Sequence, residues 1–356
     1  MKNQQPAAAQ RRNAARIKRQ KQRRRRKMIR RLLTVLLIVA AISGIAALGF
    51  IAKDLIFKEP VQAYNISKEF TGSQVSASEG KAKLFASDLC VVTEDILLDQ
   101  VSLEENQTGL LFDISDKEVI YSKGAYTRVY PASITKIMTA LLAFKYGNMD
   151  DVVTITEENV TLEEGSQVIG FLAGDKVTMD ELVHGLLVYS GNDAASAIAT
   201  HIGLTTEKFV EMMNSYAKEL GCTGTHFTNP HGLQDENHYT TPYDIYLMLK
   251  EALQYPEFTE ITQLGSYTIS YERSWGEEVS TSLLATDHYL TGEANAPKGI
   301  TILGGKTGTT SDAGNCLALL SQNAYGEPYV SIVMGASTKE LLYQQMSALL
   351  ENANNE

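Results

Sequence analysis

Apolar positions after residue 108 recur with two periods, and each period predicts a different kind of element. Beyond Pro131 they fall at 134, 137, 138, 141 and 142, a helical spacing that buries one face. By the same spacing and by capping signals, further helices are expected at 180–188, 193–202, 207–220, 242–253 and 337–351, the last of them capped by Ser337. Short apolar runs bounded by turn residues predict strands at 109–114, 118–121, 299–310, 316–321 and 329–334.

These elements follow one another as a strand pair, a run of helices, three strands and a final helix. Strands and helices that are segregated along a chain favour an α+β domain with an antiparallel sheet. We expect this domain to occupy residues 88–353, because the globular pattern begins near Asp88 and leaves no room for a second domain after it.

A separate apolar segment lies near the start of the chain. Residues 32–52 are 21 positions without a charge, which is long enough to cross the hydrocarbon core of a membrane as a helix. Basic residues crowd the side before this segment, and such residues stay on the cytoplasmic side of a span. The sequence therefore predicts a single-pass protein of the cell membrane, with a basic cytoplasmic tail (1–31), an extracytoplasmic linker (53–87) and an extracytoplasmic main domain.

The basic region before residue 32 allows two other interpretations. The run from Arg23 to Lys27 could bind nucleic acid, but no folded reader module or interleaved aromatic residues accompany it, so we expect no nucleic-acid partner. A cleaved secretion signal also begins with basic residues. Here the basic region is too long for one, and no clear small-x-small site precedes Lys53. An uncleaved membrane anchor is the better interpretation.

Charge is distributed unevenly along the chain. The total is -10, but residues 1–53 carry 15 of the 32 Lys and Arg and no acidic residue. The remainder therefore carries 17 basic and 42 acidic residues, a net charge of -25. A field of this sign repels anionic substrates, so a site for such a substrate needs a positive group of its own.

The three cysteines do not predict a disulfide framework or a metal site. Cys90, Cys222 and Cys316 cannot all pair within one chain, and none belongs to a CxxC motif. We expect them to be small buried hydrophobic residues, and we expect no metal and no cofactor.

Ser133 and Lys136 open the helix that follows Pro131. A spacing of three residues places both side chains on one helical face, at the end where the helix dipole is positive. A serine hydroxyl there needs a base. A lysine one turn later can serve if burial and nearby positive charge lower its pKa. Alone, this Ser-x-x-Lys spacing is a weak signal.

Two further motifs also have ordinary structural explanations. Ser190-Gly-Asn192 falls in a tight turn between helices, where Asn192 could cap the next helix. Lys306-Thr307-Gly308 falls on a strand, where the lysine could protect an edge from aggregation. Glycines at 304, 305 and 308 could also let a substrate backbone approach this strand closely.

In their order and settings the three motifs are far more specific than each is alone. Together they resemble the motif set of the penicillin-recognising serine enzymes. The chain is most similar to one branch, the serine D-alanyl-D-alanine carboxypeptidases or low-molecular-weight penicillin-binding proteins, over about residues 109–347. This resemblance implies a fold like that of β-lactamases and transpeptidases, with helices on both faces of an antiparallel sheet and a mostly helical lobe. The segments that carry it are YPASITKIMTA (130–140), LVYSGNDAA (187–195), TNPHGL (228–233) and GKTGTT (305–310).

The resemblance implies a role for each catalytic residue. Ser133 would attack the carbonyl between the two terminal D-alanines of a peptidoglycan stem peptide, and Lys136 would take its proton. Ser190 would relay a proton to the departing D-alanine, while Asn192 positions Lys136 and the substrate amide. Water would then hydrolyse the acyl-enzyme. β-Lactams would be covalent inhibitors that acylate the same serine.

Substrate binding is implied for the strand that carries the third motif. Lys306 and Thr307 would bind the substrate carboxylate, with Gly308 and Thr309 completing the binding strand. The oxyanion hole would consist of the backbone N–H groups of Ser133 and Thr309, an arrangement worth several kcal/mol in acyl transfer. At position 309 some members of the family have histidine, so the chain departs from them there.

Four alternative functions remain in view. A transpeptidase or endopeptidase would use the same site with a different acceptor or bond. A class A β-lactamase needs a deacylating glutamate followed four residues later by asparagine, and no glutamate between Ser190 and Lys306 has that partner. A zinc peptidase could use His226, His231, Asp235 and His238, but these lie on a loop without an HExxH helix. A non-catalytic wall sensor is disfavoured because every reactive position is intact.

Overall fold

The computed structural model describes residues 88–354. The predicted tail, membrane helix and linker (1–31, 32–52 and 53–87) lie outside the described residues. Within the described range, no helix combines the length and the apolar character that crossing a membrane requires.

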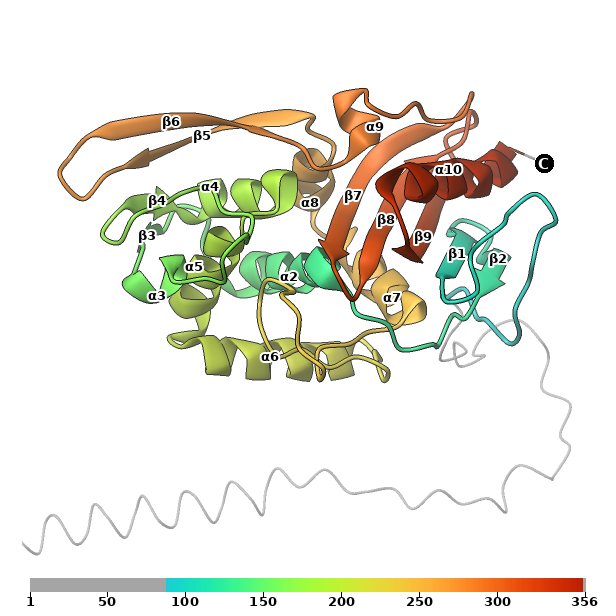
Figure 1. Ribbon diagram of the computed structural model, residues 1–356, viewed down its shortest axis with the longest axis horizontal. Helices are drawn as coiled ribbons and strands as arrows, with labels where there is room; N and C mark the ends of the chain where they lie inside the picture. Colours follow the sequence, from blue (N-terminus) through green and yellow to red (C-terminus); the bar gives the residue numbers. More distant parts are fainter. Residues whose placement is uncertain (1–87, 355–356) are drawn as a thin grey trace, which may run out of the picture. The chain divides into compact units, whose positions relative to one another are not determined.

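Strands from both ends of the described chain form one antiparallel sheet (Figure 1). The first hairpin lies beside the last three strands, in the order β2-β1-β9-β8-β7. All four neighbouring pairs are antiparallel, which confirms the expected α+β class. The strands are β1 (Thr108–Asp113), β2 (Glu118–Lys123), β7 (Thr301–Thr310), β8 (Gly314–Gln322) and β9 (Pro328–Ala336).

Alternation along the central strands explains why both faces of this sheet are covered. Leu317 and Leu319 of β8 pack in a cluster with the last helix, α10 (Lys339–Leu350), whereas Ala318 and Leu320 belong to the larger core on the other face. Burying one leucine side chain contributes about 1.5–3 kcal/mol. The near-continuous apolar run of β8 therefore stabilises two layers at once.

The helices of the second face and of the lobe match the predicted positions closely. The buried stripe after Pro131 forms α2, and its residues Ile137 and Leu141 are fully buried. The helix expected at 180–188 is split, because a π-helical turn continues α4 up to the second motif. These elements are α2 (Lys136–Tyr146), α4 (Met179–His184), the π-helix η3 (Gly185–Tyr189), α5 (Asn192–Gly203), α6 (Thr206–Glu219) and α7 (Pro242–Ala252).

A second sheet was not expected from the sequence. It has the order β3-β4-β5-β6, and its long hairpin β5–β6 lies along the lobe in Figure 1. Its only clear sequence signal is the alternation of Tyr267, Ile269 and Tyr271 on β5. The unexpected elements are β3 (Val152–Thr154), β4 (Lys176–Thr178), β5 (Ser266–Glu272), β6 (Glu278–Leu284), α3 (Glu157–Val160), α8 (Pro256–Thr262), α9 (His288–Thr291) and η4 (Glu351–Asn354).

Two smaller expectations have different outcomes. All three cysteines are free and buried, as expected. The cap of α10 is Thr338 rather than Ser337, because the Thr338 hydroxyl accepts the hydrogen bond from the Leu341 N–H.

Candidate active site

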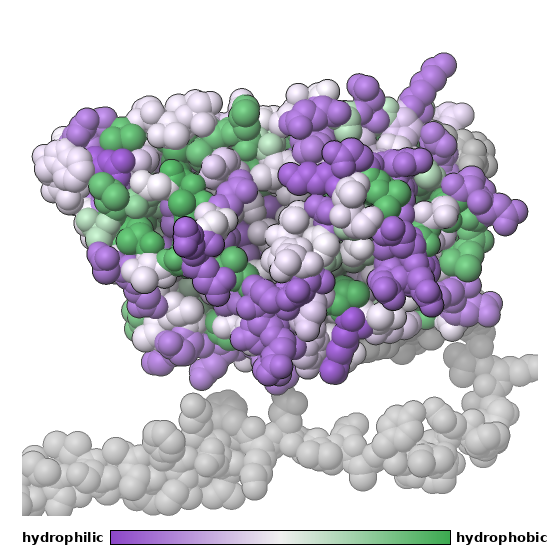
Figure 2. Space-filling view, viewed as in Figure 1, coloured by the Kyte–Doolittle hydropathy of each residue, from purple (hydrophilic) through white to green (hydrophobic). Residues whose placement is uncertain are grey.

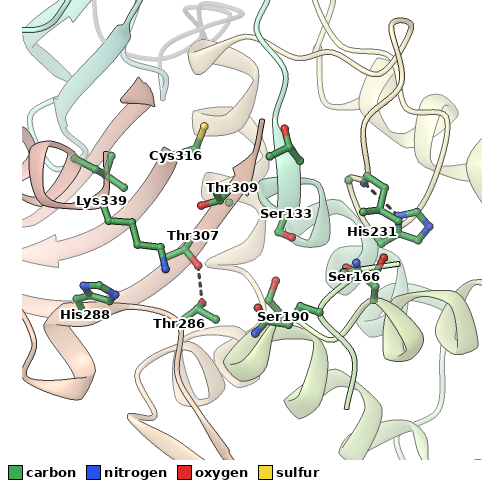
Figure 3. A pocket seen from close by; sticks show the side chains of 18 of the residues that line it. Ser133, Ser166, Ser190, His231, Thr286, His288, Thr307, Thr309, Cys316 and Lys339 are labelled. Atoms are coloured by element: carbon green, nitrogen blue, oxygen red, sulfur yellow. Dashed lines mark hydrogen bonds between the residues drawn. The ribbon is translucent and has the colours of Figure 1, made fainter. Parts of the chain in front are cut away.

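The three sequence motifs meet at one cavity. Its volume is about 260 Å³, and Figure 2 shows a hollow in the middle of the face that carries it. Figure 3 shows that side chains from many separate parts of the chain point into it. The lining residues used below are Ser133, Ser166, Gln167, Ser190, Asn192, His231, Thr286, His288, Thr307, Gly308, Thr309, Lys339 and Tyr343.

Ser133 sits on a tight turn just before α2. It belongs to a 3-10 turn, η2 (Ala132–Thr135), so it precedes the α-helix proper rather than opening it. Ala132 has a left-handed backbone with φ 48°, a conformation that costs energy for a residue with a Cβ. Gly232 packs over this turn so closely that a Cβ there would lie 1.9 Å from the Ala132 carbonyl oxygen. The strained turn is thus held in place, and it presents the Ser133 hydroxyl to the cavity.

Lys136 is fully buried and contacts Ser133 directly. Its Nζ lies 2.8 Å from Ser133 Oγ, and it donates hydrogen bonds to Asn192 Oδ1 at 2.6 Å and to the His231 carbonyl at 2.7 Å. Burial, followed by the nearby charge of Lys306, lowers the pKa of Lys136 well below its usual value. The lowered pKa favours the neutral amine, which is the form that can accept a proton.

The acceptors around Lys136 also fix the direction of proton transfer. A neutral amine has two N–H groups and one lone pair. The Asn192 amide oxygen and the His231 carbonyl can only accept hydrogen bonds, so they take the two N–H groups. The lone pair then faces the Ser133 hydroxyl, which is the one partner that can donate.

The second motif forms a strained corner between η3 and α5. Ser190 is left-handed, with φ 68°, and its hydroxyl reaches the cavity. Such π-helical insertions and backbone strain are frequent at functional sites. Asn192 does not cap α5 as its ordinary interpretation suggested, because Gly191 occupies the cap position and Asn192 begins the helix. The Asn192 side chain is thereby free to accept from Lys136.

Lys306 lies behind Ser190 rather than on the cavity surface. It is 1% exposed, so it does not act as a solvated edge lysine. Its Nζ donates to Ser190 Oγ at 2.9 Å and to the Thr307 carbonyl at 3.1 Å. Burial lowers the pKa of Lys306 to about 7, and nearby Asp287 opposes that shift. The structure therefore pairs each motif serine with a buried lysine.

The glycines of β7 serve contacts within the protein. A Cβ at Gly304 would lie 2.2 Å from Thr262 Oγ1, and one at Gly305 would lie 2.1 Å from the Ala318 carbonyl. The expectation that these two glycines admit a substrate backbone is therefore wrong, because other parts of the chain fill that space. Gly308 differs, since a Cβ there would lie 3.0 Å from the Ser133 backbone nitrogen. Its missing side chain keeps the backbone N–H of the nucleophile close to β7.

Hydroxyl groups line the part of the cavity formed by β7. Thr307 and Thr309 both reach it, and Thr307 Oγ1 shares a 2.5 Å hydrogen bond with Thr286 Oγ1. Thr309 Oγ1 donates to Asn315 Oδ1 at 3.2 Å. Because β7 is the outer strand of its sheet, some of its backbone groups have no strand partner. This edge can offer both hydroxyl and backbone hydrogen bonds to a ligand.

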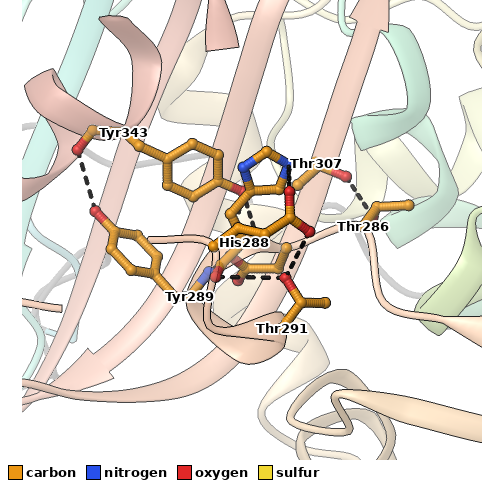
Figure 4. A network of polar contacts seen from close by, with 8 residues as sticks. Thr286, His288, Tyr289, Thr291, Thr307 and Tyr343 are labelled. Atoms are coloured by element: carbon orange, nitrogen blue, oxygen red, sulfur yellow. Dashed lines mark hydrogen bonds and ion pairs between the residues drawn. The ribbon is translucent and has the colours of Figure 1, made fainter. Parts of the chain in front are cut away.

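Thr286 and His288 reach the cavity from the segment after β6, and a polar network holds that segment to α10 (Figure 4). The His288 N–H donates to the Tyr343 hydroxyl at 2.8 Å, and that hydroxyl donates to Asp287 Oδ1 at 3.3 Å. The His288 and Tyr343 rings stack at 4.7 Å. Sequence reasoning missed this group, because its members belong to no motif.

Sequence reasoning also gave no role to Asp193, which is 1% exposed beside the second motif. Its carboxylate accepts from the backbone N–H groups of Ile169 at 3.0 Å and Gly170 at 2.9 Å. The Asn192 N–H adds a bond to the Gln167 carbonyl at 2.8 Å. These contacts fix the loop that brings Ser166 and Gln167 to the cavity. The available sequence signal was its position, because Asp193 directly follows Asn192 of the second motif.

Replacing Asp193 with alanine is expected to lower the free energy of unfolding by about 2–4 kcal/mol, because several backbone N–H groups lose a charged acceptor. Thermal denaturation would measure this as a melting temperature lower by several degrees. Asp150→Ala, at an exposed acidic position, is the matched control and should change little. Equal melting temperatures for the two variants would refute a structural role for Asp193.

The histidines of the segment 226–238 have separate hydrogen-bond partners. His238 Nε2 lies 2.7 Å from Thr135 Oγ1, and His226 Nδ1 lies 2.6 Å from the Asn237 carbonyl. Burial lowers the pKa of His231 to about 3, with the Lys136 charge adding to the effect. Across the described residues, no three His, Cys, Asp or Glu side chains are grouped so that they could hold a metal ion.

Comparison with known proteins agrees with this geometry. The D-alanyl-D-alanine carboxypeptidase family, peptidase family S11, matches residues 100–338. The Bacillus subtilis D-alanyl-D-alanine carboxypeptidase DacF is 35% identical over 255 residues, covering 70% of this chain and 62% of its own. Escherichia coli DacC is 32% identical over 254 residues, covering 68% and 59%. The chain thus spans about three fifths of the length of these curated relatives.

Solved structures show the same fold. The Streptomyces K15 DD-transpeptidase has a TM-score of 0.63 at 25% identity, covering 69% of this chain and 95% of its own. The carboxypeptidase DacD from Francisella tularensis has a TM-score of 0.61 at 25% identity, covering 73% of each chain. The family match covers most of the described residues and all three motifs. The resemblance seen in the motifs is confirmed: this chain belongs to the D-alanyl-D-alanine carboxypeptidase family of serine peptidases, peptidase family S11.

Proposed function

We propose that the chain is a serine D-alanyl-D-alanine carboxypeptidase that removes the terminal D-alanine from peptidoglycan stem peptides. One observation carries the proposal: Lys136 Nζ lies 2.8 Å from Ser133 Oγ beside the cavity, and its pKa is lowered. This pair supplies a nucleophile together with a base that can be neutral. The family and the relatives' names support the same activity.

Acylation begins with attack of Ser133 Oγ on the carbonyl between the two D-alanines. The hydroxyl proton passes to the Lys136 lone pair as the C–O bond forms. Negative charge develops on the carbonyl oxygen, where the Ser133 and Thr309 N–H groups would stabilise it. Collapse of the intermediate breaks the C–N bond, and the departing amine takes a proton delivered through Ser190.

Deacylation needs a base for water, and the cavity lining narrows the choice. None of its residues in the described part of the chain is a carboxylate. A glutamate-activated water of the class A β-lactamase type therefore has no candidate there. Lys136, neutral again after leaving-group protonation, is the group in contact with the acyl oxygen. β-Lactams would form the same bond to Ser133 and remain attached as inhibitors.

We further propose that residues 32–52 anchor the protein in the cell membrane with the catalytic domain outside. The support is the 21-residue uncharged segment and the basic residues before it. Peptidoglycan substrates lie outside that membrane, which agrees with this topology. Protease added to intact cells should remove the domain while leaving the basic tail protected. A domain that stays intact until the cells are lysed would contradict the proposal.

A DD-transpeptidase is the second candidate, because solved structures with this fold carry that name. The two activities share an acyl-enzyme and differ in whether water or an amine accepts the acyl group. A diacetyl-L-Lys-D-Ala-D-Ala peptide, incubated with and without a glycine acceptor, separates them. We expect the amount of D-alanine released to equal the amount of dipeptide product formed by hydrolysis. A product dominated by the glycine adduct would favour the transpeptidase, and no D-alanine release would refute both.

Replacing Lys306 with methionine is expected to shift the pH dependence of acylation. The positive charge of Lys306 helps to keep the pKa of Lys136 low, second to burial. Without that charge the pKa of Lys136 rises. When the solution is acidified, Lys136 is then protonated, and lost as a base, at a higher pH than in the wild type. The acidic limb of the penicillin acylation rate should therefore move to higher pH. An unchanged limb would show that the two lysines are not coupled in this way.

A further inference from the structure

The hairpin β5–β6 has one exposed face that consists almost entirely of hydroxyl groups. Its other face packs on the core of the domain through Ile269, Tyr271 and Leu283. None of the outward side chains carries a charge, although the chain after residue 53 has 17 basic and 42 acidic residues. We call this surface the hydroxyl face; it consists of three cross-strand pairs, Ser266 with Leu284, Thr268 with Ser282, and Ser270 with Ser280.

The chain's one tryptophan, Trp275, lies in the turn that joins β5 to β6. Figure 1 shows this closed end of the hairpin at the far end of the lobe. Trp275 is 63% exposed, although an indole ring is one of the largest apolar surfaces that a side chain can bury. Tryptophan is enriched where proteins bind partners. Its exposure at this turn therefore indicates a binding role, since it contributes little to the core.

Several contacts fix the orientation of the indole. Its Nε1 donates to Glu277 Oε2 at 2.8 Å, and the Arg273 guanidinium lies 5.9 Å from the ring centroid. Arg273 is itself fixed, because it donates to the buried Asp175 carboxylate at 2.7 Å. The turn closes through a 2.8 Å hydrogen bond from the Gly276 N–H to the Arg273 carbonyl. A ring that is already oriented loses little side-chain entropy on binding, which favours association.

The surroundings of Trp275 favour a neutral ligand that is rich in hydroxyl groups. Glu277 and Glu278 are exposed beside it, and they repel nucleic acids and other polyanions. A protein interface has further aromatic and apolar residues at its centre, whereas the adjoining strands are rich in serine and threonine. Sugars match both features. The C–H face of a sugar ring packs on an indole, and its hydroxyls exchange hydrogen bonds with hydroxyl and carboxylate side chains.

The open end of the hairpin lies at the catalytic cavity. β6 ends at Leu284, and Thr286, two residues later, lines the cavity. Seven residues of strand span roughly 23 Å, so the hairpin connects the cavity with Trp275 over that length. A few extended residues of a stem peptide cover about 10–15 Å. The glycan that carries a bound stem peptide therefore passes within reach of the hairpin.

We propose that the hydroxyl face, with Trp275 at its end, binds the glycan chain of peptidoglycan. This inference rests on the proposed function and adds the class of substrate: stem peptides that are attached to a polysaccharide, rather than free peptides. The hairpin holds the polymer while Ser133 reacts with the stem peptide. It therefore affects KM for the polymer and leaves the chemical step unchanged.

The first test uses the indole itself as the probe. Because Trp275 is the one tryptophan of the full-length chain, the tryptophan fluorescence reports on this position alone. We expect N-acetylchitotetraose, a neutral amino-sugar oligomer, to shift the emission of the full-length protein in a saturable way. Ser133→Ala should respond like the wild type, because glycan binding needs no acylation. An emission that stays constant up to millimolar oligomer would overturn the glycan site.

The second test compares a polymeric substrate with a free peptide. D-Alanine release is measured from purified peptidoglycan and from diacetyl-L-Lys-D-Ala-D-Ala, and co-sedimentation with insoluble peptidoglycan measures binding directly. Trp275→Ala should lower kcat/KM on the polymer by about tenfold and leave kcat/KM on the free peptide unchanged. Trp275→Phe should lose less, because it keeps an aromatic ring.

Two further variants complete the second test. Replacing Thr268 and Ser282 together with alanine removes one hydroxyl pair, which should lower kcat/KM on the polymer by about threefold. Tyr325→Ala is the matched control, because it removes another aromatic residue that is 80% exposed, on the turn between β8 and β9. It should change neither substrate's kcat/KM.

The outcomes separate this inference from the proposed function. If Trp275→Ala keeps wild-type co-sedimentation and wild-type kcat/KM on the polymer, the glycan site is wrong whatever the enzyme's reaction. If the wild type releases no D-alanine but binds peptidoglycan and the oligomer through Trp275, the glycan site stands and the carboxypeptidase activity falls. Co-sedimentation that depends on Trp275 without a fluorescence response to the oligomer would indicate a protein or peptide of the wall as the ligand, and would overturn the glycan assignment.

Discussion

Replacement of Ser133 by alanine is expected to abolish D-alanine release, with a loss of roughly 10⁴-fold or more in kcat. The reason is chemical: the acyl-enzyme cannot form without the hydroxyl that contacts Lys136 at 2.8 Å. Binding need not change much, because the cavity loses one oxygen atom. Stopped-flow or end-point release of D-alanine from diacetyl-L-Lys-D-Ala-D-Ala measures the effect.

Thermal denaturation is the control for this variant. Ser133 is only partly buried, and exposed hydroxyls contribute little to stability, so the melting temperature should stay close to that of the wild type. Ser166→Ala offers a matched control, since it removes another hydroxyl that lines the same cavity. It should retain most of the activity. Wild-type turnover by Ser133→Ala would show that another group is the nucleophile.

Replacement of Lys136 by methionine is the second large effect we expect. Methionine has a similar length but cannot accept a proton, so acylation by benzylpenicillin should slow by about 10²–10⁴-fold. In the wild type, the base is active only when neutral. Because its pKa is lowered well below the usual value of a lysine, acylation should persist at pH values below that usual pKa and fall as the pH drops through the lowered pKa.

Lys145→Met is the matched control for the base, because it removes another lysine from the same helix, away from the cavity. Its Nζ lies 3.6 Å from Glu219 on the surface, and such exposed pairs contribute about 0–1 kcal/mol. Lys145→Met should therefore be acylated at the wild-type rate. Equal acylation of the Lys136 and Lys145 variants would exclude Lys136 as the base.

The sequence predicted the large sheet and the main helices because their apolar patterns are long and regular. The stripe from Ile134 to Leu142 has helical period throughout, and the runs at β8 and β9 are buried almost continuously. The small sheet was not predicted, because β3 and β4 have only three residues each. Its longer strands, β5 and β6, are rich in serine and threonine. Only their pairing with each other in space identifies them as parts of a sheet.

The reactive residues were predictable for a different reason, since the motifs fix their chemistry locally. Lys136 Nζ joins Ser133 and Asn192 at hydrogen-bonding distances, and Ser190 lines the same cavity with its own lysine, Lys306, behind it. The motifs did not reveal which lysine lines the cavity. Burial of Lys306 and the approach of Lys339 depend on how α10 packs against the segment after β6, which no local pattern records.

Peptide mapping shows directly whether Ser133 is the residue that becomes covalently acylated. Purified wild-type protein is exposed briefly to benzylpenicillin, digested and analysed by mass spectrometry. We predict one stoichiometric adduct on the peptide that contains Ser133, absent from Ser133→Ala. An unmodified protein, or an adduct on a peptide that lacks Ser133, would show that Ser133 is not the nucleophile.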